Sequence, residues 1–537
     1  MSKTASFTVA AALAVALATP MSAQEPQHKA PPPSADHVKA LIQQAMAQTT
    51  PGTQVPGAPT GPVVNLTIDE AVSRAIEKNV TLASQRLTPR TFDYSIAATL
   101  AAYRPTLTSL FSNNAATQLP TTTVEGGTVV TTDTQRWNAG VQQAVPWGGG
   151  NYSVTFNNNR VFTDRDNATF NPSFGSVLTA QYNQPLLRNF RTDATRTQLE
   201  SQKIQQDIAE IDLAATTAST VAQVRIAYWE LVFAYQAVEA SQRSLDLATK
   251  LVTDNKSRVE IGTMAPIDVV QAQAEEASRR QQLVTAQGTV RNTELNLKRL
   301  IVSGTDDDLW NATVNPVDRP SPEPEPIDLD GAVRNALQNR TDLIINRKNI
   351  DSTNLTIKSL RNAKLPQLNL LTQYQLDGRG GTTIPRNPGE IFIRGGYWDA
   401  LHNISAWDAP TWTLQLNFSY PIGQSADEAN LARQRIILQQ NQTQIKTTEL
   451  QIATDVTSAA LQVRNTLEGL QAAQASRELS EQRLKAAQSK FDVGMATNFE
   501  VVQAQRDLND AQNSELRQLL NYRRALVDLE RVQISPR

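Results

Sequence analysis

The sequence of 537 residues contains no cysteine and only three histidines. The absence of cysteine excludes disulfides, thiolate catalysis, cysteine-ligated metals and a lipid anchor on a processed N-terminal cysteine. His28 and His37 lie in a proline-rich stretch, and His402 lies in a segment rich in glycine and aromatic residues. No residue set points to a histidine-based catalytic or zinc site. We therefore expect no enzyme, no metal and no other cofactor.

A large net charge and long apolar runs are also missing. The formal net charge is −2, which gives no electrostatic reason to expect nucleic acid as a partner. The apolar run at residues 7–18 follows Lys3 and is too short for a membrane anchor, so residues 1–23 are predicted to be a secretory signal peptide. No later stretch reaches the roughly 18 apolar residues of a transmembrane helix. Residues 24–65 are predicted to be a proline-rich flexible linker, with one short helix near residues 38–46.

One loop sequence occurs twice. VEIGTMAPIDVVQAQ occupies residues 259–273, and FDVGMATNFEVVQAQ occupies residues 491–505. Glycine at the same place in both copies indicates a backbone conformation that other residues avoid. Each copy has an acidic residue six positions after this glycine: Asp268 follows Gly262, and Glu500 follows Gly494.

Further matches surround the two loops in the same order. A helix start at 66–79 matches one at 327–339, and each half then has one proline where a helix gives way to a strand and another where a strand ends. The sequence therefore predicts a tandem duplication, with repeat 1 at 66–310, a proline-rich linker at 311–326 and repeat 2 at 327–533. The four prolines at strand boundaries are Pro105, Pro185, Pro366 and Pro421.

Each repeat contains an unusually long helical pattern. Residues 194–258 contain neither proline nor glycine, and apolar residues recur at steps of three and four. The second copy, at residues 427–490, is interrupted in composition only by Gly469. A helix of this length forms a rod of roughly 100 Å. Its narrow apolar stripe requires partner helices, as in a coiled coil, and its remaining Gln-, Thr-, Ser- and Ala-rich surface could line water.

Between the prolines the pattern changes to a period of two, which predicts strands at about 106–186 and 366–421. Apolar residues from Trp412 to Tyr420 alternate with Thr, Gln, Asn and Ser. A half-buried soluble sheet would show such alternation, and so would a membrane β-barrel. The uncharged polar face and the aromatic residues near the strand ends favour the barrel.

Repeat 1 contains one additional alternating pair, at residues 137–145 and 151–156, joined by PWGGG. The glycines predict a tight hairpin turn rather than a phosphate loop, because no Lys-Ser/Thr pair follows them. The pair would form either an extracellular flap or two inserted strands, giving six strands per chain rather than four. Extracellular loops are expected at 117–135, 163–176 and 377–410.

The chain resembles the TolC-type outer-membrane efflux protein family over residues 66–533. The matching features are the L-T-x-x-E-A-V helix start, the x-P-x-L strand entry, the Q-P-L-L strand exit and the loop that occurs twice. The resemblance implies a mixed α/β membrane protein with two tandem helix–strand–strand–helix repeats. It implies a homotrimer, with an outer-membrane β-barrel that continues into a periplasmic α-helical coiled-coil barrel.

The resemblance also implies roles for the two loops, with tips at about 259–268 and 491–500. In the family these tips contact a periplasmic adaptor, and acidic residues just past them narrow the closed pore. The expected aperture residues are Asp268, Glu500 and Gln503, although Asp268 and Glu500 would also be favoured simply as acids at a helix start. Gln503 and Ala496 replace an aspartate and an arginine of the best-known family member, so any ion-pair latch would differ here. The expected adaptor-contact residues are Gly262, Thr263, Met264, Gly494, Met495 and Ala496.

The function implied is that of an outer-membrane exit duct in a tripartite export or type I secretion system. Such a duct passes small molecules or secreted proteins from an inner-membrane RND or ABC transporter and its periplasmic adaptor (membrane fusion) protein across the periplasm and outer membrane. The alternative is a periplasmic coiled-coil scaffold without a pore. The substrate and the transporter class do not follow from the sequence.

Membrane fractionation distinguishes these alternatives. A barrel surrounded by outer-membrane lipid should remain in the pellet after carbonate extraction, because its strands bury apolar side chains in the bilayer. Release of the protein into the supernatant would instead identify a peripheral scaffold.

Overall fold

The computed structural model describes residues 62–119, 125, 128–319, 326, 328–385, 391–423 and 425–535. The expected signal peptide, and the expected linker up to residue 61 with its short helix, lie outside the described residues. The structure differs from both expected linkers, because one short strand begins inside the linker expected at 24–65 and another lies inside the one expected at 311–326. Strand β1 (Val63–Leu66) pairs in parallel with β6 (Thr313–Pro316). Their buried side chains Leu66 and Val314 join a hydrophobic core against the long helices, which accounts for the ordered strands.

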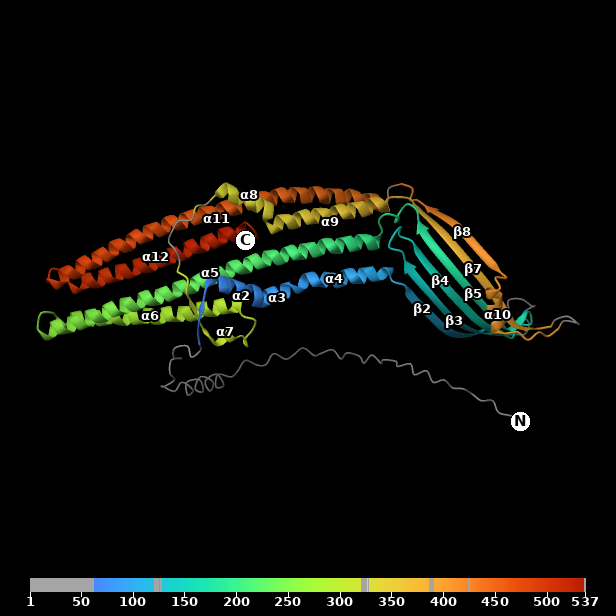
Figure 1. Cartoon of the computed structure of the whole chain (residues 1–537), viewed down its shortest axis with the longest axis horizontal. Coiled ribbons are helices and arrows are strands. Elements are labelled where there is room, and N and C mark those ends of the chain that lie inside the picture. Colours follow the sequence, from blue (N-terminus) through green and yellow to red (C-terminus); the bar gives the residue numbers. More distant parts are fainter. Residues whose placement is uncertain are drawn as a thin grey trace, which may run out of the picture. The chain divides into compact units, whose positions relative to one another are not determined.

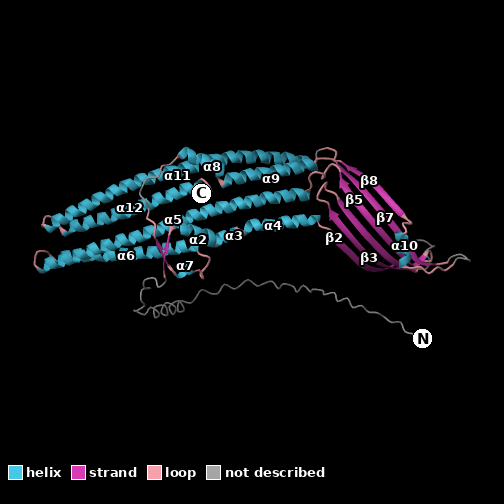
Figure 2. Ribbon diagram, in the orientation of Figure 1, coloured by secondary structure: helices cyan, strands magenta, loops and turns pink. Residues whose placement is uncertain are grey.

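The long helices form where the sequence predicts them (Figures 1 and 2). The first is α5 (Ala194–Glu260), followed by α6 (Pro266–Ile301), and the second is α11 (Ala426–Asp492), followed by α12 (Asn498–Val532). Among the described residues, no helix combines the length and apolar character needed to cross a membrane. The shorter helices are α2 (Ile68–Lys78), α3 (Val80–Gln85), α4 (Leu87–Leu100), η1 (Ala101–Tyr103), α7 (Asp308–Asn311), α8 (Leu329–Asn339), α9 (Thr341–Ala363) and α10 (Tyr397–Ser405).

One antiparallel sheet of six strands contains segments from both repeats. The spatial order is β2-β3-β4-β5-β7-β8. In Figure 1 this sheet lies at one end of the long helices, and the α5–α6 and α11–α12 turns lie at the other end. The strands are β2 (Thr106–Gln118), β3 (Val130–Ala144), β4 (Asn151–Thr163), β5 (Phe170–Pro185), β7 (Gln367–Thr383) and β8 (Pro410–Ser419).

The additional alternating pair of repeat 1 forms β3 and β4 inside this sheet, so each chain contributes six strands. Repeat 1 therefore contains four strands, and the expected helix–strand–strand–helix pattern holds only for repeat 2. In the register of β3 with β4, the apolar residues of the two alternating patterns lie opposite each other. Ala139 pairs with Phe156, and Val141 pairs with Val154.

The strands extend into the segments that were expected to be extracellular loops. β2 continues to Gln118, β5 begins at Phe170, and β7 continues to Thr383. The segment expected as a loop at 377–410 also contains α10. The expected loops are therefore shorter than predicted. The structure places Pro105 and Pro366 immediately before β2 and β7, Pro185 at the end of β5, and Pro421 two residues after β8.

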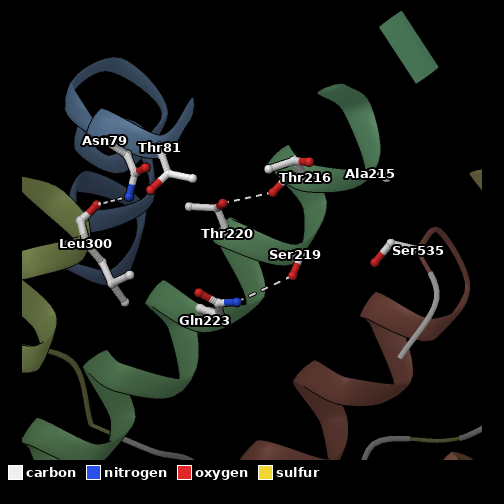
Figure 3. Close-up of a pocket in the computed structure, with 9 residues that line it drawn as sticks. All are labelled: Asn79, Thr81, Ala215, Thr216, Ser219, Thr220, Gln223, Leu300 and Ser535. Carbon is white, nitrogen blue, oxygen red and sulfur yellow. Dashed lines mark hydrogen bonds between the residues drawn. The ribbon is translucent and has the colours of Figure 1, made fainter. Parts of the chain in front are cut away.

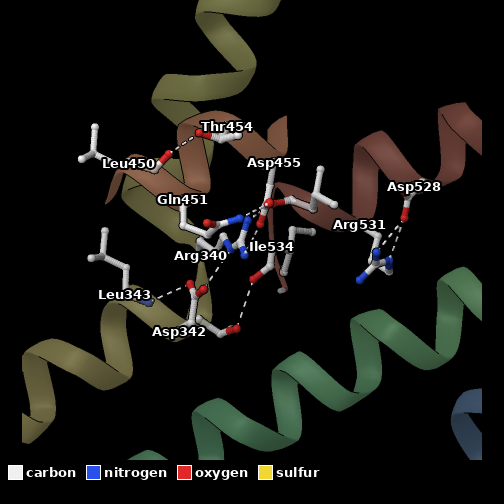
Figure 4. Close-up of polar contacts among 12 residues, drawn as sticks. Arg340, Asp342, Leu343, Leu450, Gln451, Thr454, Asp455, Asp528, Arg531 and Ile534 are labelled. Atoms are coloured by element: carbon white, nitrogen blue, oxygen red, sulfur yellow. Dashed lines mark hydrogen bonds and ion pairs between the residues drawn. The ribbon is translucent and has the colours of Figure 1, made fainter. Parts of the chain in front are cut away.

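A buried arginine joins three segments of repeat 2 (Figure 4). Arg340, 2% exposed, lies between α8 and α9. Its guanidinium donates to Asp455 of α11 at 3.0 Å, to Asp342 at 3.1 Å, and to the Val532 carbonyl at the end of α12 at 3.4 Å. The other Asp455 oxygen accepts from Gln451 at 2.7 Å. Helices α8, α9, α11 and α12 therefore meet around one satisfied charge cluster.

Replacement of Arg340 tests how much this cluster contributes to stability. Arg340→Met leaves the Asp455 carboxylate without its guanidinium partner, and loss of one partner of a buried pair costs ~3–5 kcal/mol. We expect a lower midpoint of helix unfolding, followed by circular dichroism.

The matched control is Arg464→Ala, which removes an exposed ion pair between Arg464 and Glu468 of 3.1 Å within α11. Such pairs contribute ~0.3–0.5 kcal/mol. Equal effects of the two substitutions would contradict the role given to Arg340.

Candidate functional site

The two copies of the duplicated loop adopt the same backbone motif. At the end of α5, the Gly262 N–H donates to the Val259 carbonyl at 3.0 Å, and the Thr263 N–H donates to the Arg258 carbonyl at 2.9 Å. At the end of α11, Gly494 donates to Phe491 at 3.1 Å and Met495 to Lys490 at 2.8 Å. This pair of bonds is the Schellman motif, whose glycine adopts the left-handed conformation. The φ values are +76° at Gly262 and +77° at Gly494.

The helices that follow the two turns begin differently. In α12, Thr497 accepts from the Glu500 N–H, and the Glu500 carboxylate accepts from the Thr497 N–H, which is a capping box. In α6, Pro266 follows an Ala265 cap that supplies no side-chain hydrogen bond. Asp268 and Glu500 both occupy the third position of their helices. The Glu500 carboxylate thus serves as a helix cap, and the Asp268 carboxylate lies near a helix N-terminus.

The two helical hairpins pack against each other just behind the turns. Asn255 of α5 donates to the Asn498 side chain at 3.0 Å, and Asn498 donates to the Asp268 carbonyl at 3.3 Å. The Arg258 guanidinium lies 4.4 Å from the centre of the Phe491 ring. These polar contacts surround an apolar cluster of Leu251, Val252, Ala272, Phe491, Val501 and Val502.

A charge cluster around the buried Glu275 lies two helical turns from the first tip and was not predicted. Arg506 of α12 donates two hydrogen bonds to Glu275 of α6, at 2.9 and 2.6 Å. Arg279 also donates to Glu275, at 2.7 Å. Burial alone would raise the pKa of the Glu275 carboxyl, but the Arg506 hydrogen bond and both positive charges together lower it. The only sequence signal was the spacing of Glu275 and Arg279, four residues apart on a helix.

The structure separates the residues predicted for the site into exposed and packed groups. Met264 and Ala496 pack on the apolar cluster between the hairpins, whereas Thr263 and Met495 are exposed. Gln503 donates to Asp507 at 2.8 Å. Within the described chain, no hydrogen bond or ion pair joins the Asp268 and Glu500 side chains.

Exposed apolar residues around the turns were not predicted as a group. They flank the two glycines and include residues on both hairpins, so the tips present an apolar surface. Only their occurrence beside the duplicated loops could have indicated them. These residues, here called the tip surface, are Ile261, Ile267, Val270, Val493, Met495 and Phe499.

A separate cavity of about 330 Å³ lies away from the duplicated loops, between α3, α5 and the end of the described chain (Figure 3). Its lining is uncharged and includes Asn79, Thr216, Ser219 and Ser535. The Asn79 side chain caps α3 through its oxygen and donates to the Leu300 carbonyl at 2.9 Å. In the described residues no group of three or more His, Cys, Asp or Glu is arranged to hold a metal ion.

Alanine substitution of the two turn glycines tests the Schellman geometry. A Cβ added at Gly262 or Gly494 meets no atom within 4 Å, so any loss arises from the backbone alone. We expect Gly262→Ala and Gly494→Ala each to cost ~1–2 kcal/mol of local stability. Hydrogen exchange of the amides at the tips measures this loss.

Gly288 provides the matched control, because it lies inside α6 and its added Cβ also meets nothing within 4 Å. Gly288→Ala should stabilise the helix by ~0.5–1 kcal/mol. If the tip amides of Gly262→Ala and Gly494→Ala were as protected from exchange as those of Gly288→Ala, the two turns would not require a residue that readily adopts the left-handed conformation.

Comparison with known proteins identifies the family. The family model described as "Outer membrane efflux protein" matches residues 151–302 and 332–532. CusC is a structural match with a TM-score of 0.63 and 14% identity, covering 90% of this chain and 96% of that chain. The Campylobacter jejuni CmeC outer membrane channel has a TM-score of 0.61 and 16% identity, covering 87% of this chain and 85% of that chain. The Neisseria gonorrhoeae MtrE outer membrane channel, in its open state, has a TM-score of 0.57 and 17% identity, covering 87% and 89% respectively. No curated protein matches the sequence.

These matches confirm the TolC-like fold, and the family match includes parts of both repeats. They support a non-enzymatic outer-membrane efflux channel with a periplasmic helical portion, rather than a scaffold without a pore. The chain belongs to the outer membrane efflux protein family.

Proposed function

We propose that three copies of the chain form an exit duct whose periplasmic end is built by the α5–α6 and α11–α12 hairpins. The observation that carries this proposal is the duplicated tip. Two hairpins of one chain end in the same Schellman turn and place an acidic residue at the third position of the next helix. Channels of the TolC type are trimers, so the complex would have six such tips. Repetition of one tip around an axis is what a ring-shaped aperture requires.

The edges of the sheet support assembly through neighbouring copies. Within the described sheet, β2 and β8 each pair on one side only. Every residue of β8 is exposed. The five pairings are all antiparallel, so β2 and β8 run in opposite directions. The β8 strand of one copy can therefore continue the antiparallel order onto β2 of the next, and six strands from each of three copies give eighteen.

The tip surface supports contact with a periplasmic adaptor protein. Its exposed apolar residues, Met495 among them, lie around Gly262 and Gly494, where an adaptor could cover them, and Thr263 lies exposed beside them. Through the adaptor the duct would receive cargo from an inner-membrane transporter of the RND or ABC class. The cargo would be small molecules or secreted proteins, and type I secretion is one such use.

The aperture would be lined by Asp268, Glu500 and Gln503. In a trimer the two acids supply six carboxylates near one constriction, and such a ring favours cations over anions. Each acid also has a local role at its helix start, which is explicit for the capping box of Glu500. A test must therefore remove the charge without removing the cap. Glutamine retains the capping hydrogen bond of the box, so Glu500→Gln isolates the charge.

Single-channel recording in a planar lipid bilayer tests the duct and its aperture. We expect the purified protein to form small, cation-selective openings. Asp268→Ala with Glu500→Ala should raise the conductance by removing side-chain volume and charge from the constriction. Asp268→Asn with Glu500→Gln should reduce cation selectivity while hydrogen exchange at the start of α12 remains unchanged.

Asp254→Ala is the matched control, since this exposed acid lies on α5 two turns before the tip. It should leave conductance and selectivity unchanged. Wild-type conductance and selectivity in both double variants would remove Asp268 and Glu500 from the aperture. A membrane-inserted trimer without any channel activity would contradict the duct itself.

A further inference from the structure

The two faces of the six-stranded sheet differ in polarity, and the difference is clearest on β8. On β8, Trp412, Leu414, Leu416 and Phe418 share one face, and Thr413, Gln415 and Asn417 share the other. The register carries the apolar face across the sheet, because Leu416 pairs with Leu370, Leu376 with Leu178, and Leu178 with Phe156. In an outer-membrane channel the apolar face contacts lipid and the polar face lines the lumen.

Helix α10 packs on the apolar face, at the ends of the strands far from the long helices (Figure 1). Gly378 and Gly380 of β7 lie on the same face as Leu376, and glycine is required there by close approach. A Cβ at Gly378 would lie 1.9 Å from the Ala400 carbonyl oxygen, and one at Gly380 would lie 2.2 Å from that of Gly396. Ala400 and Leu376 are buried beneath this contact.

Aromatic contacts hold the start of α10 across three more strands. The Tyr397 ring lies 5.3 Å from the Trp137 ring of β3 and 6.2 Å from the Phe174 ring of β5. The Tyr397 hydroxyl donates to the Asn158 side chain of β4 at 3.0 Å. The helix is thus fixed against the outward face of the sheet.

The height of α10 on this face coincides with the end of the apolar band. From Leu368 to Leu376, β7 advances eight residues, or ~26 Å at the usual strand rise. With a strand tilt near 40°, this is ~20 Å along the barrel axis, close to the ~25 Å apolar band of outer-membrane barrels. A charged side chain, Arg160, occupies the same face at the level of Phe174 and Gly380. Helix α10 therefore lies where lipid tails give way to headgroups.

The outer surface of α10 and its neighbours has the composition of a membrane interface. Trp398 is 79% exposed and Trp407 is 61% exposed. The polar residues Asp399 and His402 lie beside Trp398 on the exposed side of the helix. Tryptophan among polar groups is typical of the headgroup level. Residues Ile391, Phe392 and Ile393, just before α10, are also exposed.

We propose that residues 391–408, here called the α10 segment, form an interfacial anchor in the headgroup layer of the outer leaflet. Trp398 and the 391–393 triplet contact lipid, and Tyr397, Ala400 and Ile404 fix the helix to the barrel wall. The partner is a lipid surface, because the α10 segment continues the lipid-facing side of the sheet. This inference rests on outer-membrane location and the polarity of the sheet, and it does not depend on the aperture or the adaptor.

Site-directed spin labelling tests the anchor, and the chain contains no cysteine that would need removal. The test variants are Trp398→Cys and Phe392→Cys, each exposed and outside the packed side of α10. The matched controls are Leu414→Cys on the apolar face of β8 and Thr413→Cys on its polar face. Each labelled protein is reconstituted in phospholipid vesicles. Collision with oxygen, which concentrates in lipid, is compared with collision with a water-soluble nickel chelate.

We expect the oxygen-to-nickel ratio at Trp398→Cys and Phe392→Cys to shift away from the Thr413→Cys value, toward that of Leu414→Cys. A ratio equal to that of Thr413→Cys at both positions would overturn the proposal, because the α10 segment would then lie in water. Loss of access to both reagents would also overturn it, because another protein surface would then cover the segment. The two controls separately report whether the sheet itself is inserted, so failure of the anchor is distinguishable from failure of the barrel.

Discussion

The backbone groups at the two edges of the sheet impose the constraint on which the rest of the molecule depends. Strands β2 and β8 each have one side without a partner in the described sheet. Every unpaired backbone group in hydrocarbon costs several kcal/mol, so an open edge cannot persist in a membrane. A family member in the outer membrane must therefore close its sheet through other copies. The opposite directions of β2 and β8 make such closure possible without any parallel pairing, and the axis of that closure also fixes where the long helices and their tips converge.

The long helices also need packing partners, and side-chain charges rather than backbone hydrogen bonds join them. The polar face of β8 carries only uncharged side chains, whereas the helices are joined by charge clusters around the buried Arg340 and Glu275. Each cluster joins segments far apart in the sequence and satisfies its charges through several partners. Arg506 of α12 and Arg279 of α6 share the Glu275 carboxylate, so this cluster links the two hairpins close to their tips. At the outer end of the sheet, the proposed anchor in the α10 segment adds a third kind of surface. Its exposed aromatic residues follow the aliphatic residues of the apolar face.

Much of this architecture follows from sequence patterns of sufficient length. The absence of proline and glycine from residues 194–258 predicts α5 to within two residues, and the duplicated glycines predict both turns. Strands β1 and β6 were missed because four residues next to proline-rich segments carry too little periodicity. The insertion of β3 and β4 could not be decided from alternation, which a flap would share. The Asn255–Asn498 and Glu275–Arg506 contacts join residues more than 200 positions apart, and no local pattern specifies such pairs. Helix α10 was missed because its nine residues lie in a glycine-rich segment.

Cryo-electron microscopy of the purified protein in lipid nanodiscs tests the central claim most directly, because it resolves the strands around the membrane. The account predicts a closed antiparallel barrel of eighteen strands from three copies, with β8 of each copy paired to β2 of the next. It also predicts that β3 and β4 lie within the barrel wall. A twelve-stranded barrel with β3 and β4 outside the wall, or a single copy with unpaired edges, would contradict it.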